Sequence, residues 1–177
     1  PEIEWARGSR LILLTAHRRE NLGEPMREMF RAIRRIVDET PDIKVIYPMH
    51  KNPAVREMAR ACFGGQERIH MIEPLDVLDF HNVMAHAYLI MTDSGGIQEE
   101  APALGKPVLV MRDTTERPEG VVAGTLKLVG TDENTIYAAV RELLTDPAAY
   151  HEMEHAVNPY GDGHASRYIA DILAREL

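Results

Sequence analysis

The stretch that decides the fold is Tyr88-Leu89-Ile90-Met91-Thr92-Asp93-Ser94-Gly95-Gly96-Ile97-Gln98-Glu99-Glu100. Its first five residues form a short, largely apolar run, which is typical of a strand buried on both faces of a parallel sheet. The two glycines let the chain turn, and the residues after them fit the start of a helix. A buried strand that leads through a turn into a helix is the repeating unit of an α/β protein.

The rest of the chain alternates in the same way. Runs rich in Leu, Ile and Val predict six strands, at residues 10–16, 43–48, 68–72, 88–92, 107–111 and 126–129. Helical patterns are found at residues 25–40, 53–62, 76–86, 95–105, 132–145, 147–156 and 164–175. Six strands separated by helices imply right-handed crossovers. We therefore expect the α/β class, with a doubly wound, mainly parallel six-stranded sheet and helices on both faces.

Length and composition limit the kind of protein. With 177 residues, 45% of them hydrophobic and 27% charged, the chain suits one soluble globular domain rather than a disordered or collagen-like protein. The formal net charge of −8 argues against a nucleic-acid-binding surface, so an anionic ligand needs a local pocket. No apolar run approaches the roughly 18 residues of a membrane span, and the single Cys62 cannot form an internal disulfide. We expect a cytoplasmic protein with neither a nucleic-acid nor a membrane partner.

The turn after the strand at 88–92 is the strongest candidate for a ligand site, because ligands of such sheets bind where strands end. Ser94 is expected to cap the next helix, and Gly95 and Gly96 let a ligand reach the backbone N–H groups, which suits a phosphate or diphosphate. Glu100 is placed to accept hydrogen bonds from a diol such as ribose. The alternative is a capped helix with glycines for tight packing and surface glutamates. The chain contains neither a G-x-G-x-x-G nor a Walker pattern.

A second polar group follows the first predicted strand: His17, Arg18, Arg19 and Glu20. Guanidinium groups can clamp phosphate or carboxylate oxygens, and a histidine can transfer protons near neutral pH. The alternative is a solvated loop in which Arg and Glu pair with one another. His50 holds the same kind of position after the second strand, where a helix cap is the more common role.

Two further features lie near the same edge of the predicted sheet. Residues 112–119 form a polar loop that closes over a ligand in one interpretation and is simply solvated in the other. Phe80 is a core aromatic in the more common interpretation and a platform for a stacked base in the other.

One pattern near the C-terminal end of the sequence resembles a zinc-binding motif, but we do not predict a metal site there. His151-Glu152-Met153-Glu154-His155 matches H-E-x-x-H, which places two zinc ligands on one helical face in metalloproteases. Tyr150, Met153 and Val157 form an apolar stripe that explains the helix without a metal. Catalytic zinc also needs a third protein ligand and an open cleft. We expect no metal.

Five motifs resemble those of the non-hydrolysing UDP-N-acetylglucosamine 2-epimerase family. They occur in the family's order and span nearly the whole chain: Thr15-Ala16-His17-Arg18-Arg19-Glu20-Asn21, Tyr47-Pro48-Met49-His50, 92–107, 111–119 and Asn158-Pro159-Tyr160-Gly161-Asp162-Gly163. The resemblance implies a glycosyltransferase type B (GT-B) fold, in which two Rossmann-like domains face each other across a cleft. It also implies that residues 1–177 are the C-terminal, UDP-binding Rossmann-like domain.

The resemblance implies a reaction as well. Members of the family interconvert UDP-N-acetylglucosamine and UDP-N-acetylmannosamine: they eliminate UDP to give 2-acetamidoglucal and add it back with C2 inverted, with no metal or other cofactor. Carried over by position, the implied roles are a catalytic histidine at His17; UDP contacts at Phe80, Ser94, Gly95, Gly96, Glu100 and Arg117; and contacts to a second, activating UDP-sugar at Arg18, Glu20 and His50.

The family's acid and base carboxylates, an Asp and two Glu, belong to its N-terminal domain. We expect that half to be missing here, because the chain opens on Pro1 directly before the first predicted strand. The expected partners are UDP, a UDP-N-acetylhexosamine, the missing N-terminal domain and a second copy in a homodimer. The isolated chain is expected to bind UDP but not to catalyse the epimerisation. Two alternatives stay open: the C-terminal domain of a UDP-sugar glycosyltransferase, and a non-enzymatic fragment that only binds nucleotide.

Overall fold

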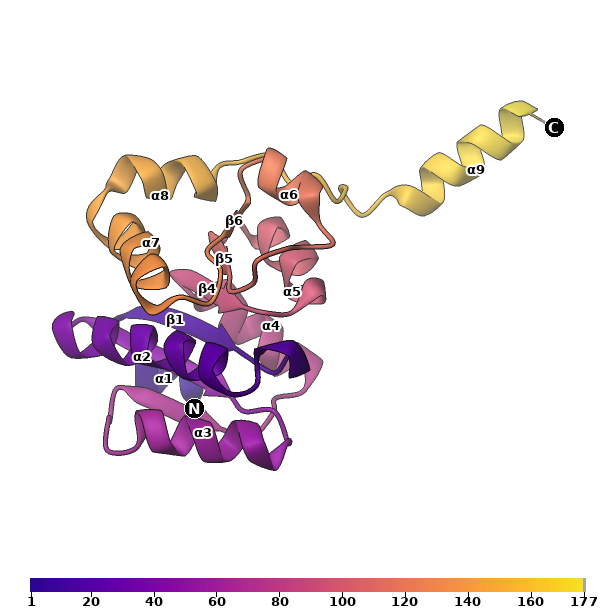
Figure 1. Cartoon of the computed structure of the whole chain (residues 1–177). Helices are drawn as coiled ribbons and strands as arrows, with labels where there is room; N and C mark the ends of the chain where they lie inside the picture. Colours follow the sequence, from indigo (N-terminus) through magenta and orange to yellow (C-terminus); the bar gives the residue numbers. More distant parts are fainter. Residues whose placement is uncertain (177) are drawn as a thin grey trace.

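The computed structural model describes residues 1–176 and contains one six-stranded sheet (Figure 1). Its strands are β1 (Arg10–Thr15), β2 (Ile43–Pro48), β3 (Ile69–Ile72), β4 (Leu89–Thr92), β5 (Val108–Val110) and β6 (Leu126–Leu128). Neighbouring strands all pair in parallel, in the order β3-β2-β1-β4-β5-β6. The predicted fold class is confirmed, and no strand boundary differs from its prediction by more than one residue.

Helices cover both faces of the sheet. They are α1 (Glu2–Ala6), α2 (Glu24–Glu39), α3 (Pro53–Phe63), α4 (Val77–His86), α5 (Gly95–Glu100), α6 (Pro118–Val122), α7 (Glu133–Thr145), α8 (Pro147–Glu154) and α9 (Ala165–Glu176), with 3₁₀ turns η1 (Arg19–Asn21) and η2 (Ala101–Leu104). Alternate residues of β1 enter opposite cores, as a strand requires. Ile12 and Leu14 join the core that contains Phe30 of α2. Leu11 and Leu13 join the core that contains Met84 of α4.

The strand order brings the ends of β1 and β4 together. The chain passes from β1 outward to β2 and β3, and then returns to the other side of β1 with β4. Thr15, the last residue of β1, is in register with Thr92, the last residue of β4. The place where the strand order reverses is where open α/β sheets bind ligands at their carboxyl ends. The loops after β1 and β4 therefore lie at the expected ligand position.

Three connections differ from the sequence predictions. The helix α1 precedes β1, where we expected the chain to lead straight into the first strand, and α6 occupies the end of the predicted loop 112–119. Both helices are five residues long and too short to show an apolar stripe. The predicted helix at 95–105 is divided into α5 and η2, because Pro102 has no backbone N–H and its ring crowds the preceding turn. Gly105 ends this segment with a left-handed conformation, at φ 63°.

The last described helix, α9, projects away from the rest of the molecule (Figure 1). None of its residues is buried. Tyr168, Ile169, Ile172 and Leu173 recur at three- and four-residue spacing, and each is more than half exposed. This helix was predicted, but its apolar side is uncovered by residues 1–176. None of the helices in that range, α9 included, has the length and apolar character that crossing a membrane requires.

Tyr47→Phe tests how the end of β1 is held. Tyr47 is fully buried against Phe63, and its hydroxyl donates a hydrogen bond of 2.9 Å to the carbonyl of Ala16. The variant leaves this buried carbonyl without its partner, so we expect the free energy of unfolding to fall by ~1–2 kcal/mol, measured by urea denaturation. Tyr137→Phe is the control, because it removes an exposed hydroxyl bonded to Glu39 and is expected to change stability by less than ~0.5 kcal/mol. An equal loss in both variants contradicts the prediction.

Candidate functional site

A cavity of about 390 Å³ opens at the carboxyl edge of the sheet. Its lining includes His17 after β1, His50 after β2, Leu75 after β3, Phe80 from α4 and Ile97 from α5. Two imidazoles and several apolar side chains surround a space of the size that small-molecule ligands occupy. Three of the residues predicted from the sequence as site residues, His17, His50 and Phe80, are therefore brought together by the fold.

His50 and His17 are in direct contact. Their rings stack with centroids 5.5 Å apart and an angle of 17° between the planes. His50 Nδ1 also accepts a hydrogen bond of 3.1 Å from the backbone N–H of Asn52, which is the N-cap residue of α3. The capping hydrogen bond of α3 comes from Asn52, whose side chain accepts from the N–H of Ala54, so His50 is not the helix cap and instead lines the cavity.

Asp93 fixes the loop after β1 to the loop after β4. Its side chain is fully buried, and one carboxylate oxygen accepts hydrogen bonds of 2.8 Å from the backbone N–H groups of both His17 and Arg18. In return, Arg18 Nε donates to the backbone carbonyl of Asp93 at 3.1 Å. At the strand ends themselves, the hydroxyls of Thr15 and Thr92 are 2.6 Å apart. No local pattern predicts this role of Asp93, because its partners are more than 70 positions away in the sequence.

The glycine turn leaves its backbone open. Ser94 holds the N-cap position of α5, but its side chain makes no capping hydrogen bond, so that expectation was wrong. A Cβ atom built on Gly95 would lie 3.6 Å from Nη2 of Arg18, and one on Gly96 would lie 3.8 Å from a Glu100 carboxylate oxygen. These are ordinary van der Waals distances, so packing within the chain does not demand glycine at either position. The Arg18 guanidinium lies beside the same turn, which places a positive charge where the backbone is bare.

Glu100 and Phe80 lie on the two helices that flank the turn. A Glu100 carboxylate oxygen is 3.0 Å from Nε2 of His81, a contact that was not predicted from the sequence. Phe80 packs against the core beside α4 and also lines the cavity. Both roles proposed for Phe80, core aromatic and ring-stacking surface, are open to it in this position.

Arg112 joins the loop after β5 to the loop after β1. Its side chain is almost fully buried; Nη1 donates to Glu116 at 2.6 Å and Nε donates to Glu20 at 3.1 Å. The hydrogen bond from Arg112 lowers the pKa of Glu116 to about 2, so this residue stays a carboxylate near neutral pH. Arg18 Nη2 is 3.7 Å from the same carboxylate. Glu20 therefore pairs with Arg112 and Arg18 with Glu116, so both residues of the loop after β1 have their partners in the loop after β5 rather than in each other.

Residues 113–117 are also attached to α5. The hydroxyl of Thr115 donates to Gln98, a buried residue that donates in turn to the carbonyl of Ser94 at 3.1 Å. Arg117 Nε donates to the carboxylate of Glu99, and this hydrogen bond raises the pKa of Arg117. The loop is thus held against the glycine turn and is not merely solvated. A phosphate that binds Arg117 has to compete with or displace Glu99.

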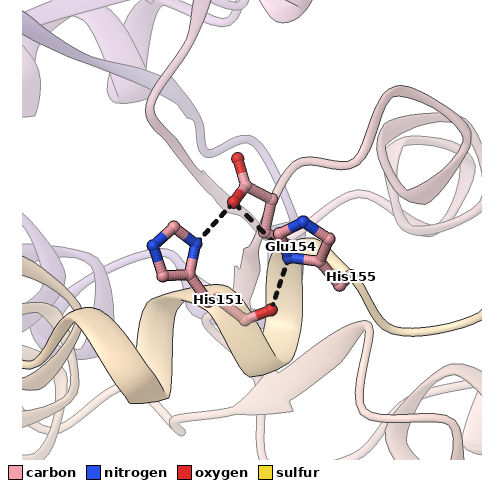
Figure 2. A group of neighbouring side chains, drawn as sticks. All are labelled: His151, Glu154 and His155. Carbon is pink, nitrogen blue, oxygen red and sulfur yellow. Dashed lines mark hydrogen bonds and ion pairs between the residues drawn. The ribbon is translucent and has the colours of Figure 1, made fainter.

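The H-E-x-x-H pattern produces a side-chain cluster at the end of α8, separate from the cavity lining (Figure 2). His151 Nδ1 and His155 Nδ1 lie 2.9 Å and 3.6 Å from the same oxygen of Glu154, while Glu152 of the pattern is not in the group. Both histidines are exposed, and a carboxylate between two imidazoles accounts for the cluster without a metal. Val157, predicted to complete an apolar stripe, instead lies beyond the helix and is 82% exposed.

The family model and the curated relatives point to the same family. A family model described as UDP-N-acetylglucosamine 2-epimerase matches residues 2–174. The curated UDP-N-acetylglucosamine 2-epimerase of Bacillus subtilis (strain 168) is 63% identical over 173 residues, which are 98% of this chain and 46% of that protein. The chain therefore spans about half the length of this relative.

Several of the matching solved structures are described with a bound nucleotide or nucleotide sugar. A structure described as an S. aureus MnaA–UDP co-structure matches with a TM-score of 0.93 and 54% identity, over 98% of this chain and 48% of that chain. The UDP-GlcNAc 2-epimerase from Neisseria meningitidis bound to UDP-GlcNAc matches with a TM-score of 0.91 and 43% identity, also over 98% of this chain and 48% of that one.

Proposed function

Because the chain belongs to the UDP-N-acetylglucosamine 2-epimerase family, we propose that it is the nucleotide-binding domain of such an enzyme and binds the UDP part of a UDP-N-acetylhexosamine. The observation that carries the proposal is the turn at Gly95, where the Arg18 guanidinium lies beside an open glycine backbone, two residues before Ile97 of the cavity lining. The relatives bound to UDP and to UDP-GlcNAc support this ligand. The family match over residues 2–174 favours the epimerase over a glycosyltransferase domain. The whole enzyme interconverts UDP-N-acetylglucosamine and UDP-N-acetylmannosamine in this proposal.

The three chemical parts of UDP fit three groups of residues. The backbone of Ser94-Gly95-Gly96 receives the diphosphate, since bare N–H groups and a nearby cation favour phosphate oxygens. The carboxylate of Glu100 accepts hydrogen bonds from the ribose hydroxyls, and Phe80 lies against the uracil inside the cavity. Arg117 contacts the phosphates after it exchanges its partner Glu99 for the ligand.

His17 is proposed as the catalytic residue of this half. When UDP leaves the sugar, the C1–O bond breaks and its electron pair stays on the diphosphate, which gains negative charge. His17 and the guanidinium of Arg18, beside the glycine turn, stabilise that charge in the transition state. Arg18, Glu20 and His50 are proposed contacts of a second nucleotide sugar. The stacking of His50 on His17 supports this, because it makes the two ligand positions neighbours.

The rest of the enzyme is proposed to be a second domain that supplies the acid and base. The relative from B. subtilis is about twice as long as this chain, which leaves room for such a domain. The apolar side of α9 supports the proposal, because Tyr168, Ile169, Ile172 and Leu173 have no cover within residues 1–176. A homodimer and a cytoplasmic location stay predictions from the sequence.

Glu100→Gln tests the proposed ribose contact. A carboxylate accepts hydrogen bonds from both ribose hydroxyls more strongly than a neutral amide does, so we expect UDP affinity to fall about tenfold. Affinity for 2′-deoxy-UDP, which lacks one of these hydroxyls, is expected to fall less. Isothermal titration calorimetry with the two nucleotides measures both changes. Glu152→Gln, on α8 and in the lining of a different pocket, is the matched control and is expected to bind like the unaltered chain. Equal UDP affinity in both variants contradicts the assignment.

A further inference from the structure

The buried carboxylate of Asp93 has one fully used oxygen. Oδ2 accepts from the backbone N–H groups of His17 and Arg18, each at 2.8 Å, and from Nδ2 of Asn21 at 3.4 Å. The side chain is 0% exposed. With this oxygen held from three sides, the carboxylate has a fixed orientation, and the direction of its second oxygen follows from it.

That second oxygen, Oδ1, is directed at the imidazole of His17. It is buried and has no hydrogen-bond partner within residues 1–176, while His17 Nδ1 lies 3.2 Å from it. A buried carboxylate oxygen without a donor is unfavourable. The His17 side chain is 37% exposed, and a small rotation of its ring points an Nδ1–H group at Oδ1. The stack on His50 limits larger rotations out of that plane.

We propose that Asp93 is the positioning residue of His17: it holds the imidazole in the tautomer that carries its proton on Nδ1, and so leaves Nε2 as the nitrogen available to a ligand in the cavity. The backbone contacts to Oδ2 and the side-chain contact to Oδ1 act together, because they fix both the loop and the ring that it carries. The consequence for catalysis rests on the proposed function: Nε2 is then the atom that meets the departing diphosphate. The tautomer itself does not depend on that function.

Asp93→Asn separates the two oxygens. The asparagine carbonyl can replace Oδ2 as acceptor for the backbone N–H groups, and its NH₂ group then faces His17 Nδ1 and donates to it. An imidazole that accepts at Nδ1 has to carry its proton on Nε2, so the substitution selects the opposite tautomer. Asn21→Ala is the matched control, because it removes one donor to Oδ2 and leaves Oδ1 unchanged.

Two-bond ¹H–¹⁵N NMR spectra of the chain, recorded at a pH where the imidazoles are neutral, measure the tautomers. His17→Gln identifies the His17 signals by their disappearance. We expect the Nδ1–H tautomer in the unaltered chain and in Asn21→Ala, and the Nε2–H tautomer in Asp93→Asn. An Nε2–H tautomer in the unaltered chain overturns the proposal, whether or not any variant folds. An unchanged Nδ1–H tautomer in a folded Asp93→Asn variant also overturns it.

The same samples keep this inference apart from the proposed function. The spectra contain no ligand, whereas titration with UDP tests nucleotide binding. A chain that binds UDP but carries the Nε2–H tautomer refutes the role of Asp93 alone. A chain with the expected tautomer that fails to bind UDP refutes the proposed function and leaves the role of Asp93 standing.

Discussion

Purified residues 1–177 are expected to bind UDP and to form no detectable UDP-N-acetylmannosamine from UDP-N-acetylglucosamine. Inverting C2 requires a base that removes its proton and an acid that returns one to the other face. Several carboxylates of the loops and helices at this edge of the sheet already have partners: Glu20 and Glu116 with Arg112, Glu99 with Arg117, Glu100 with His81, and Asp93 with backbone N–H groups. Each acid or base that is missing costs about 10²–10⁴-fold in rate, so two missing groups cost at least about 10⁴-fold.

Proton NMR of UDP-N-acetylglucosamine incubated with the chain measures this directly. In D₂O, a working base also exchanges the C2 proton for deuterium, which detects half of the reaction even when no product accumulates. The full-length relative from B. subtilis, about twice the length of this chain, is the positive control. Epimer or C2 exchange at a rate within 100-fold of that control would show that residues 1–177 hold their own acid and base.

The sheet was predictable because its determinants are local. The central strands β1, β4 and β5 are short, mostly buried apolar runs, and such runs are visible in the sequence without knowledge of their partners. The helix over Glu24–Glu39 is likewise marked by its own apolar spacing. The helices α1 and α6 were missed because five residues make little more than one turn, and no stripe can appear over that length.

The edge of the sheet that carries the site was also predictable, since topology alone places loops there. The contacts within the site were not. Asp93 binds the loop at His17 across 76 positions, and Arg112 binds Glu20 across 92. Such pairs depend on which loops the fold makes neighbours, and no local pattern records them. The failed cap at Ser94 has the same origin, because capping depends on a side-chain rotamer rather than on residue type alone.

Gly95→Ala is expected to weaken UDP binding by at least about 100-fold while the chain keeps its fold. The added methyl group lies 3.6 Å from the Arg18 guanidinium, an ordinary contact, so the unliganded protein accommodates it. A diphosphate held against the bare backbone cannot approach as closely past this methyl group. Each hydrogen bond to a charged phosphate oxygen contributes about 1.5–3 kcal/mol, and losing two of them accounts for the expected change in affinity.

Uridine provides the internal control for Gly95→Ala. It keeps the base and the ribose but has no phosphate, so its contacts at Phe80 and Glu100 are untouched by a methyl group at the glycine turn. We therefore expect calorimetric titration to give equal uridine affinities for the variant and the unaltered chain, and an unchanged thermal melting temperature. Parallel losses for uridine and UDP would place the diphosphate away from Gly95, because the substitution would then disturb the whole cavity. A loss of affinity for UDP but not for uridine assigns the phosphates to this turn. The diphosphate is the only group in which the two ligands differ, so the lost binding free energy belongs to it.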